Sequence, residues 1–184
     1  MKRPLMGMTM ALVAATTSEA EATELRAETG LSAAGTEWRG DVAGYGHLGL
    51  GVRIIDYFGI FGRGDVGFAA VDTRMLTLLS IGVQGWTPML GPLRIMGRAA
   101  FVHQHEESWS VVAGNVGSAL LGIGDGIRHR GGFEGGLGIE VPFFERDDFT
   151  VFAKVDGVAN IFPDPLGPRI YGGCGVGLGF DYEL

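Results

Sequence analysis

Cysteine is nearly absent from this sequence, and long apolar runs are missing altogether. Cys174 is the single cysteine among 184 residues, which excludes an intramolecular disulfide framework and any metal site built from several cysteines. No stretch reaches the roughly 18 uninterrupted apolar residues that a membrane-spanning helix requires. If the chain spans a membrane, it therefore does so with strands.

Positive charge is also in short supply. Lys and Arg number 14 against 21 Asp and Glu, which gives a net charge of -7 and a pI near 5.0. A nucleic-acid surface requires clustered Lys and Arg that replace the counterions of the phosphates. We therefore expect no nucleic-acid partner.

The first 22 residues have the pattern of a secretory signal peptide. Lys2 and Arg3 form a positive n-region, residues 5–15 form a short apolar h-region, and residues 20–22 read Ala-Glu-Ala, with small residues where signal peptidase requires them. We expect residues 1–22 to be removed and the mature chain to begin at Thr23. A frayed N-terminal helix is the alternative interpretation.

What the sequence has in abundance is glycine within apolar segments. Its 33 glycines accompany 46% hydrophobic residues and a mean hydropathy of +0.24, and they alternate with Leu, Val, Ile and Phe, which argues against disorder. Apolar residues recur at every second position, the period of a strand, and helical stripes are scarce. Eight segments show this alternation: 24–32, 42–54, 60–70, 77–86, 93–101, 133–141, 149–156 and 170–184.

The connections between these segments alternate in length. Residues 56–59, 88–92 and 142–148 are short and rich in turn formers, whereas residues 104–126 and 160–168 are longer. Strands of about 10 residues, with short turns on one side and longer loops on the other, are typical of transmembrane barrels. The sequence therefore predicts an all-β fold, an eight-stranded antiparallel up-and-down transmembrane β-barrel.

Alternation alone leaves open which face looks inward, since a soluble lipocalin-like barrel has the same period with inside and outside exchanged. Glycine dominates the polar face, as suits the crowded interior of a narrow barrel. The charges on that face are nearly balanced, and buried charges need partners. We predict a lumen filled by an ion-pair network of Arg26, Arg53, Arg63, Arg94, Arg98 and Lys154 with Glu24, Glu28, Asp65, Glu134, Glu140, Asp156, Asp181 and Glu183.

Aromatic residues gather near the predicted short turns. We expect them to form an interfacial girdle at one rim, although packing in a soluble core would also use aromatics. The residues concerned are Tyr57, Phe58, Trp86, Phe143, Phe144, Phe180 and Tyr182.

The last segment ends with alternating apolar residues, namely Val176, Leu178, Phe180, Tyr182 and Leu184. In this pattern the chain resembles the small outer-membrane β-barrel family of the OmpA/OmpX type, although that family usually ends with Phe where this chain has Leu184. The resemblance implies that residues 23–184 form one barrel in the outer membrane of a Gram-negative-type bacterium. It further implies contact with outer-membrane lipid and lipopolysaccharide, recognition of the last strand by the barrel-assembly machinery, and a monomer.

One polar cluster carries candidate chemistry: His103, His105, Glu106, Glu107 and Ser108. His and Glu at this spacing could bind a metal, or with Ser supply a nucleophile and its base. We favour a solvated loop and assign no catalytic, cofactor-binding or metal residue. Arg128, His129 and Arg130 would pair with Glu106 and Glu107, or with an anionic lipid head group.

Residues 109–123 are apolar for an extracellular loop, and we expect a short helix there that caps the barrel mouth or touches lipid. Three functions remain open at this point. The leading one is a non-enzymatic outer-membrane barrel with a structural, adhesive or envelope-maintenance role and a filled lumen. The alternatives are an outer-membrane lipid hydrolase using His103, His105 and Ser108, and a soluble periplasmic barrel that binds an apolar ligand.

Overall fold

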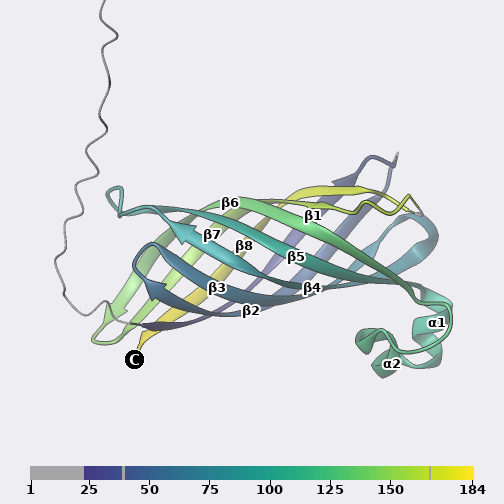
Figure 1. Cartoon of the computed structure of the whole chain (residues 1–184), viewed down its shortest axis with the longest axis horizontal. Coiled ribbons are helices and arrows are strands. Elements are labelled where there is room, and N and C mark those ends of the chain that lie inside the picture. The colour runs from purple at the N-terminus through teal and green to yellow at the C-terminus, as the bar shows by residue number, and fades with distance from the viewer. Residues whose placement is uncertain (1–22, 39, 166) are drawn as a thin grey trace, which may run out of the picture.

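A computed structural model describes residues 23–38, 40–165 and 167–184, and they form one closed antiparallel barrel (Figure 1). Each strand pairs with its neighbours in the chain, and β1 pairs with β8 to close the wall. The strands are β1 (Glu24–Thr36), β2 (Val42–Ile55), β3 (Phe58–Ala69), β4 (Arg74–Trp86), β5 (Arg94–Ser108), β6 (Arg128–Arg146), β7 (Phe149–Ile161) and β8 (Ile170–Glu183). The predicted eight-stranded up-and-down barrel is confirmed, and the predicted signal peptide, residues 1–22, lies outside the described residues.

The two ends of the barrel differ in their connections. At the turn end, β2–β3, β4–β5 and β6–β7 are joined by short connections, and β6 passes to β7 through Asp147 and Asp148 alone. At the loop end lie η1 (Val71–Thr73), α1 (Trp109–Gly114) and α2 (Val116–Leu121), opposite the C-terminus (Figure 1). Among the described residues, no helix is both long and apolar enough to cross a membrane.

Several strands extend further than the sequence pattern predicts. β5 continues to Ser108, because Thr77 pairs with His105 and Arg74 with Ser108 across the β4–β5 ladder. Residues 104–108 therefore form strand and not the loop we expected. Likewise β6 includes Pro142 and continues to Arg146, with a register shift between Pro142 and Phe144. A shift of this kind accommodates proline, which cannot donate to the ladder.

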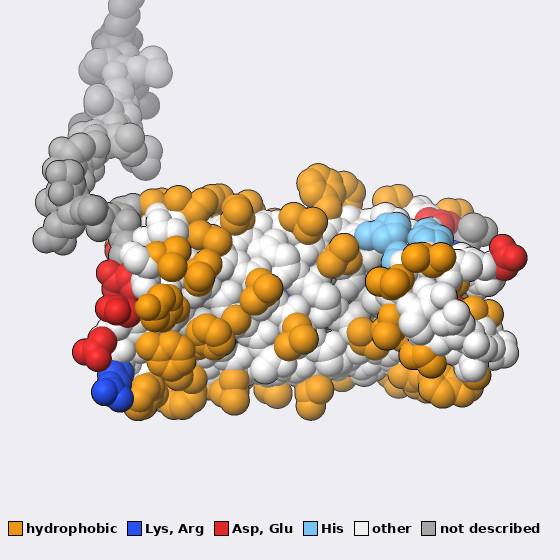
Figure 2. Space-filling model, turned by 90° about the horizontal axis from the view of Figure 1, so that it is seen from below, with side chains coloured by type: hydrophobic (Ala, Val, Ile, Leu, Met, Phe, Trp, Pro, Cys, Tyr) orange, Lys and Arg blue, Asp and Glu red, His pale blue; other side chains and the backbone are white. Residues whose placement is uncertain are grey.

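The wall of the barrel is apolar outside and polar inside. Outward side chains such as Leu50 and Phe101 are 72% and 70% exposed, and apolar side chains are spread along the outer surface between the ends (Figure 2). Inward positions of the same strands carry buried charge, for example Arg26 on β1 and Glu140 on β6. This is the polarity of a barrel that meets lipid and not of a soluble barrel.

Inward glycines let the strands come close together. A Cβ added to Gly173 would lie 1.9 Å from the carbonyl oxygen of Ala33, and one added to Gly82 would lie 2.1 Å from that of Ala99. Both clashes are with backbone of the neighbouring strand, which cannot move aside cheaply. At these two positions glycine is therefore required by the close approach of the neighbouring strand.

The predicted aromatic girdle is correct except for one residue. Tyr57, Phe58, Phe143, Phe144, Phe180 and Tyr182 are all exposed on the outside. Trp86 is only 6% exposed, and its indole Nε1 donates a hydrogen bond to Glu140 at 3.1 Å inside the lumen. The β4 register places Trp86 on the inward face together with Gln84, so it belongs to the lumen and not to the girdle.

Candidate functional site: a filled lumen and a histidine cluster

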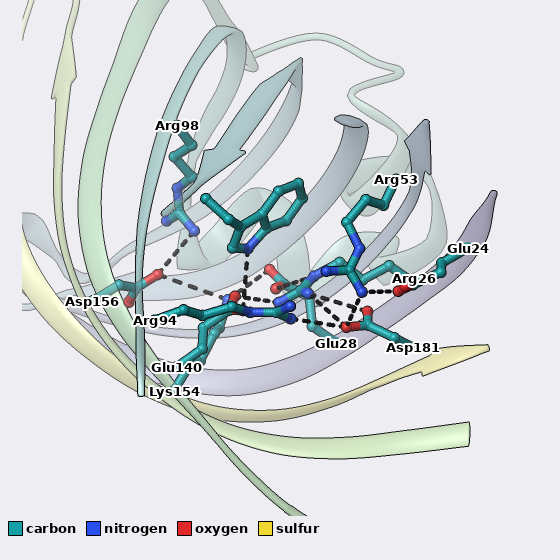
Figure 3. A network of polar contacts seen from close by, with 11 residues as sticks. Glu24, Arg26, Glu28, Arg53, Arg94, Arg98, Glu140, Lys154, Asp156 and Asp181 are labelled. Atoms are coloured by element: carbon teal, nitrogen blue, oxygen red, sulfur yellow. Dashed lines mark hydrogen bonds and ion pairs between the residues drawn. The ribbon is translucent and has the colours of Figure 1, made fainter. Parts of the chain in front are cut away.

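The turn end of the lumen is held by two carboxylates that each bind several cations (Figure 3). Glu140, on β6, accepts from Arg94 Nε at 2.8 Å and also forms an ion pair with Arg26. Asp181, on β8, accepts from Arg94 at 2.9 Å and from Arg26 at 3.1 Å, while Arg53 completes the group with Glu24. The guanidinium of Arg26 also stacks on the ring of Phe152, 3.9 Å from its centroid. Five strands, namely β1, β2, β5, β6 and β8, are thereby cross-linked by ion pairs through the interior.

The middle of the lumen continues this network. Lys154 Nζ lies 2.6 Å from Glu28, and Arg98 bridges Glu134 at 2.7 Å and Asp156 at 2.8 Å. Arg63 then joins Glu134 at 2.9 Å to Asp65 at 2.8 Å. The charges are all buried, so their mutual pairing is what makes their burial tolerable.

Above the ions, towards the loop end, the lumen is closed by an apolar layer that the sequence analysis did not predict. It contains Ala43, Tyr45, Ala69, Leu76, Leu78, Val102, Phe162 and Tyr171. In the sequence, Leu76 and Leu78 could have indicated this apolar layer, because they share a strand face with Ser80 and interrupt the polar alternation of β4. The cavity between the two layers has a volume of about 30 Å³, which exceeds the roughly 10–15 Å³ that a single water needs.

A second group of ions closes the loop end. Arg74 forms ion pairs with Asp41 and Glu106, and Arg128 forms a further ion pair with Glu106. Arg130 donates from Nε to Gln104 Oε1 at 3.0 Å and from Nη1 to the carbonyl oxygen of Pro168 at 2.7 Å. The lumen network that we predicted from the sequence contained none of these residues. Their inward direction follows from the extension of β4, β5 and β6 beyond the predicted boundaries.

Counted over the described residues, the inward ion pairs are balanced. The nine cations are Arg26, Arg53, Arg63, Arg74, Arg94, Arg98, Arg128, Arg130 and Lys154, and the nine anions are Glu24, Glu28, Asp41, Asp65, Glu106, Glu134, Glu140, Asp156 and Asp181. The predicted network is confirmed except for Glu183, which is exposed at the end of β8. An interior filled with paired charges does not provide the predominantly apolar lining that an apolar ligand requires.

Residues 103–108, which we expected in a solvated loop, belong to β5, and their side chains alternate between its two faces. Gln104 and Glu106 face inward and are buried, whereas His103, His105 and Glu107 face outward. Glu106 pairs with Arg128 and Arg130 as predicted. Glu107 does not share these pairs: it is 2% exposed beside Met75, and neither of its carboxylate oxygens has a hydrogen-bond partner among the described residues.

The predicted helical segment is confirmed as two short helices, but they do not cap the mouth. Val112 of α1 and Ala119 of α2 pack on Met75, an outward residue of β4. The pair of helices therefore lies against the outer wall at the loop end, where Figure 1 shows it beside the barrel. This packing also covers Glu107.

Three imidazoles meet on the outer wall close to these helices. His105 pairs with His129 in the β5–β6 register, and His103 lies two residues further along the same face of β5. His129 Nδ1 is 3.4 Å from His103 Nε2. Ser108, which we considered as a nucleophile, has its hydroxyl 2.9 Å from that of Ser110, and no hydrogen bond joins it to either histidine of β5 in the described part of the chain. The Ser-His arrangement of a hydrolase is therefore not assembled.

A further contact ties two loops together at the loop end. Glu37, just after β1, accepts the backbone N–H groups of Arg169 and Ile170, the latter at 2.9 Å. Slight burial opposes ionisation of this carboxyl, but the two backbone donors prevail and lower its pKa below the usual 4.5. Nothing in the sequence around Glu37 indicated this partner, because it is distant in the chain.

Comparisons with known proteins agree with this geometry at the level of fold. No protein-family model and no curated protein matches the sequence. Among solved structures, Neisserial surface protein A (NspA) is 9% identical, with 88% of this chain and 97% of that chain covered and a TM-score of 0.58. Ail, the attachment invasion locus protein of Yersinia pestis, is 10% identical over 88% and 99% of the two chains, with a TM-score of 0.53.

OprG, an outer membrane protein from Pseudomonas aeruginosa, is 11% identical, with 89% of this chain and 98% of that chain covered and a TM-score of 0.51. The closed eight-stranded antiparallel wall, its apolar exterior and its charged interior thus have the fold of the small outer-membrane β-barrels. Within that class, this chain has the fold of NspA, Ail and OprG.

Proposed function

We propose that this chain is an integral outer-membrane protein of a Gram-negative-type bacterium, and that its barrel serves as a closed, non-enzymatic platform for the loop end. Its role is structural, adhesive or envelope-maintaining, and it does not conduct solutes. The observation that carries the proposal is the filled lumen, where nine paired cations and nine paired anions lie below and above an apolar layer. A narrow barrel filled in this way has no continuous aqueous path.

The proposal extends to the location and the partners of the chain. Residues 1–22 would direct export as a signal peptide, and the last strand would be recognised by the barrel-assembly machinery. The apolar wall would contact outer-membrane lipid and lipopolysaccharide as a monomer, since closure by β1 and β8 leaves no strand edge that needs another chain. The loop end, with α1 and α2, would face the outside of the cell.

The test is the conductance of the folded barrel in planar lipid bilayers. Insertion is first established by heat-modifiable electrophoretic migration of protein extracted from membranes with detergent. We expect no current steps above the bare bilayer, with an open porin in the same bilayers as the positive control. Stable channel currents from the inserted barrel, or recovery of the native protein in the soluble periplasmic fraction, would overturn the proposal.

A further inference from the structure

The outward-facing histidines form a compact group that the closed-platform function does not use. Three of the four histidines in the chain, His103, His105 and His129, have ligand nitrogens that all lie within 4.8 Å of one another. The ring centroids of His103 and His129 are 4.7 Å and 4.8 Å from that of His105. Figure 2 shows the histidine side chains together on the outer wall near the loop end.

The position of this group on the wall is unusual for polar rings. On the same outward rows, Phe101 pairs with Phe133 and both are exposed, as lipid-facing residues are. His103 and His105 continue the row of Phe101 on β5, and His129 continues that of Phe133 on β6. The histidines therefore lie at the loop-end border of the apolar wall, where metal ions in the surrounding water can reach them.

The distances suit a transition-metal ion. Metal–nitrogen bonds of about 2.0–2.1 Å at tetrahedral angles place two ligand nitrogens about 3.3–3.4 Å apart. His129 Nδ1 and His103 Nε2 are already 3.4 Å apart. His105 supplies the third ring, with a ligand nitrogen within 4.8 Å of those of the other two, and its buried Nδ1 has no hydrogen-bond partner among the described residues.

The local fold also fixes one of the rings. Gly122 ends α2 in the left-handed conformation with φ 68°, and a Cβ added there would lie 2.2 Å to 2.6 Å from three atoms of the His105 ring. The imidazole of His105 is therefore held against the backbone of Gly122. A ligand that is positioned before the metal arrives loses less side-chain entropy on binding.

We propose that His103, His105 and His129 bind one divalent transition-metal ion of the imidazole-preferring class, with Zn²⁺ as the reference ion, on the outer wall at the loop end. Three neutral imidazoles with a fourth position open to water form a recognised ligand set for zinc, and imidazole also suits copper and nickel. Because His105 precedes the two helices and His129 follows them, the bound ion clamps the base of the segment that carries α1 and α2.

The experiment is calorimetric titration of Zn²⁺ into the full, untagged barrel refolded in detergent, together with the visible absorption of Co²⁺ in its place. We expect one ion per barrel and the intense Co²⁺ bands of a four-coordinate site. Even loss of an outer-shell partner costs metal sites about 10–100-fold in affinity, so each of H103Q, H105Q and H129Q should weaken Zn²⁺ binding at least tenfold. The triple variant should abolish it.

The matched control is H47Q, which removes the fourth histidine from inside the lumen and should bind Zn²⁺ as the unchanged barrel does. Heat-modifiable migration verifies that each variant is folded. A second readout is proteolysis between residues 109 and 126, which Zn²⁺ should slow in the unchanged barrel but not in the triple variant. No Zn²⁺ uptake at millimolar concentration, or equal uptake by the triple variant, would overturn the proposal.

Discussion

Glu140 is the residue whose removal tests the lumen network most directly. Its carboxylate is fully buried and accepts from Arg26, from Arg94 at 2.8 Å and from the indole of Trp86 at 3.1 Å. The substitution E140Q preserves the shape of the side chain but removes the charge that compensates two guanidiniums. Hydrogen bonds to charged groups contribute about 1.5–3 kcal/mol each, and breaking a buried ion pair costs about 3–5 kcal/mol. We expect a loss of about 3–5 kcal/mol in the free energy of unfolding.

Urea unfolding of the refolded barrel, followed by electrophoretic migration and tryptophan fluorescence, measures this loss. With a urea m-value of about 2–3 kcal/mol/M, the midpoint should fall by about 1–2.5 M. The matched control is E183Q at the same end of the barrel, where the carboxylate is exposed; surface changes of this kind stay within about 0.5 kcal/mol. Equal midpoints for E140Q and E183Q would refute the structural role of the network.

A double variant separates the loss of an ion pair from a simple loss of packing. Removing Arg94 together with Glu140, as R94M/E140Q, leaves Asp181 paired with Arg26 and Arg53. Replacing both members of a buried pair is often neutral, so the double variant should be less destabilised than the sum of the two single variants by about 0.5–3 kcal/mol. Strict additivity would mean that Arg94 and Glu140 do not act together.

Three further predictions concern the wall and the loop end. G173A should destabilise the barrel by about 1–3 kcal/mol through its clash with Ala33. The control is G172A, whose added Cβ meets nothing within 4 Å and which should be neutral or slightly stabilising in the same urea titration. Similar midpoints for the two variants would contradict the close approach of β1 and β8. Because the folded-state pKa of Glu37 is lowered, its contribution is present at neutral pH and is lost as the pH falls through that lowered value. The amide signal of Ile170 in NMR spectra should therefore titrate with a midpoint below 4.5 and lose this titration in E37Q, and a midpoint above it would be inconsistent with the loop contact. Cys174 is the only cysteine and an exposed outward residue of β8. A bimane fluorophore attached to it should be quenched by brominated lipid chains. Quenching by aqueous iodide alone would place this part of the wall in water.

Period two was sufficient to predict the barrel, because it is a local property that each strand expresses in its own residues. Arg26, Arg94 and Glu140 were expected in the lumen for this reason, and they are there. Strand ends were less predictable, since Ser108 stays in β5 through its pairing with Arg74 and not through any pattern of its own. Trp86 shows the same limit: its residue type suggested the girdle, but its register places it inside.

The candidate metal site lay just beyond what the sequence could show. His103 and His105 stood out as a pair, but the third ligand, His129, follows a separate segment that contains both helices. Only the β5–β6 register, which sets His105 opposite His129, brings the three rings together. That register in turn depends on β5 continuing past its alternating segment, because a loop from residue 104 to 126 would have left His105 without a fixed position opposite His129. The extension of β5 and β6 therefore creates both features of the loop end: Glu106 and Arg128 pair on the inside of the wall, while the three histidines meet on the outside.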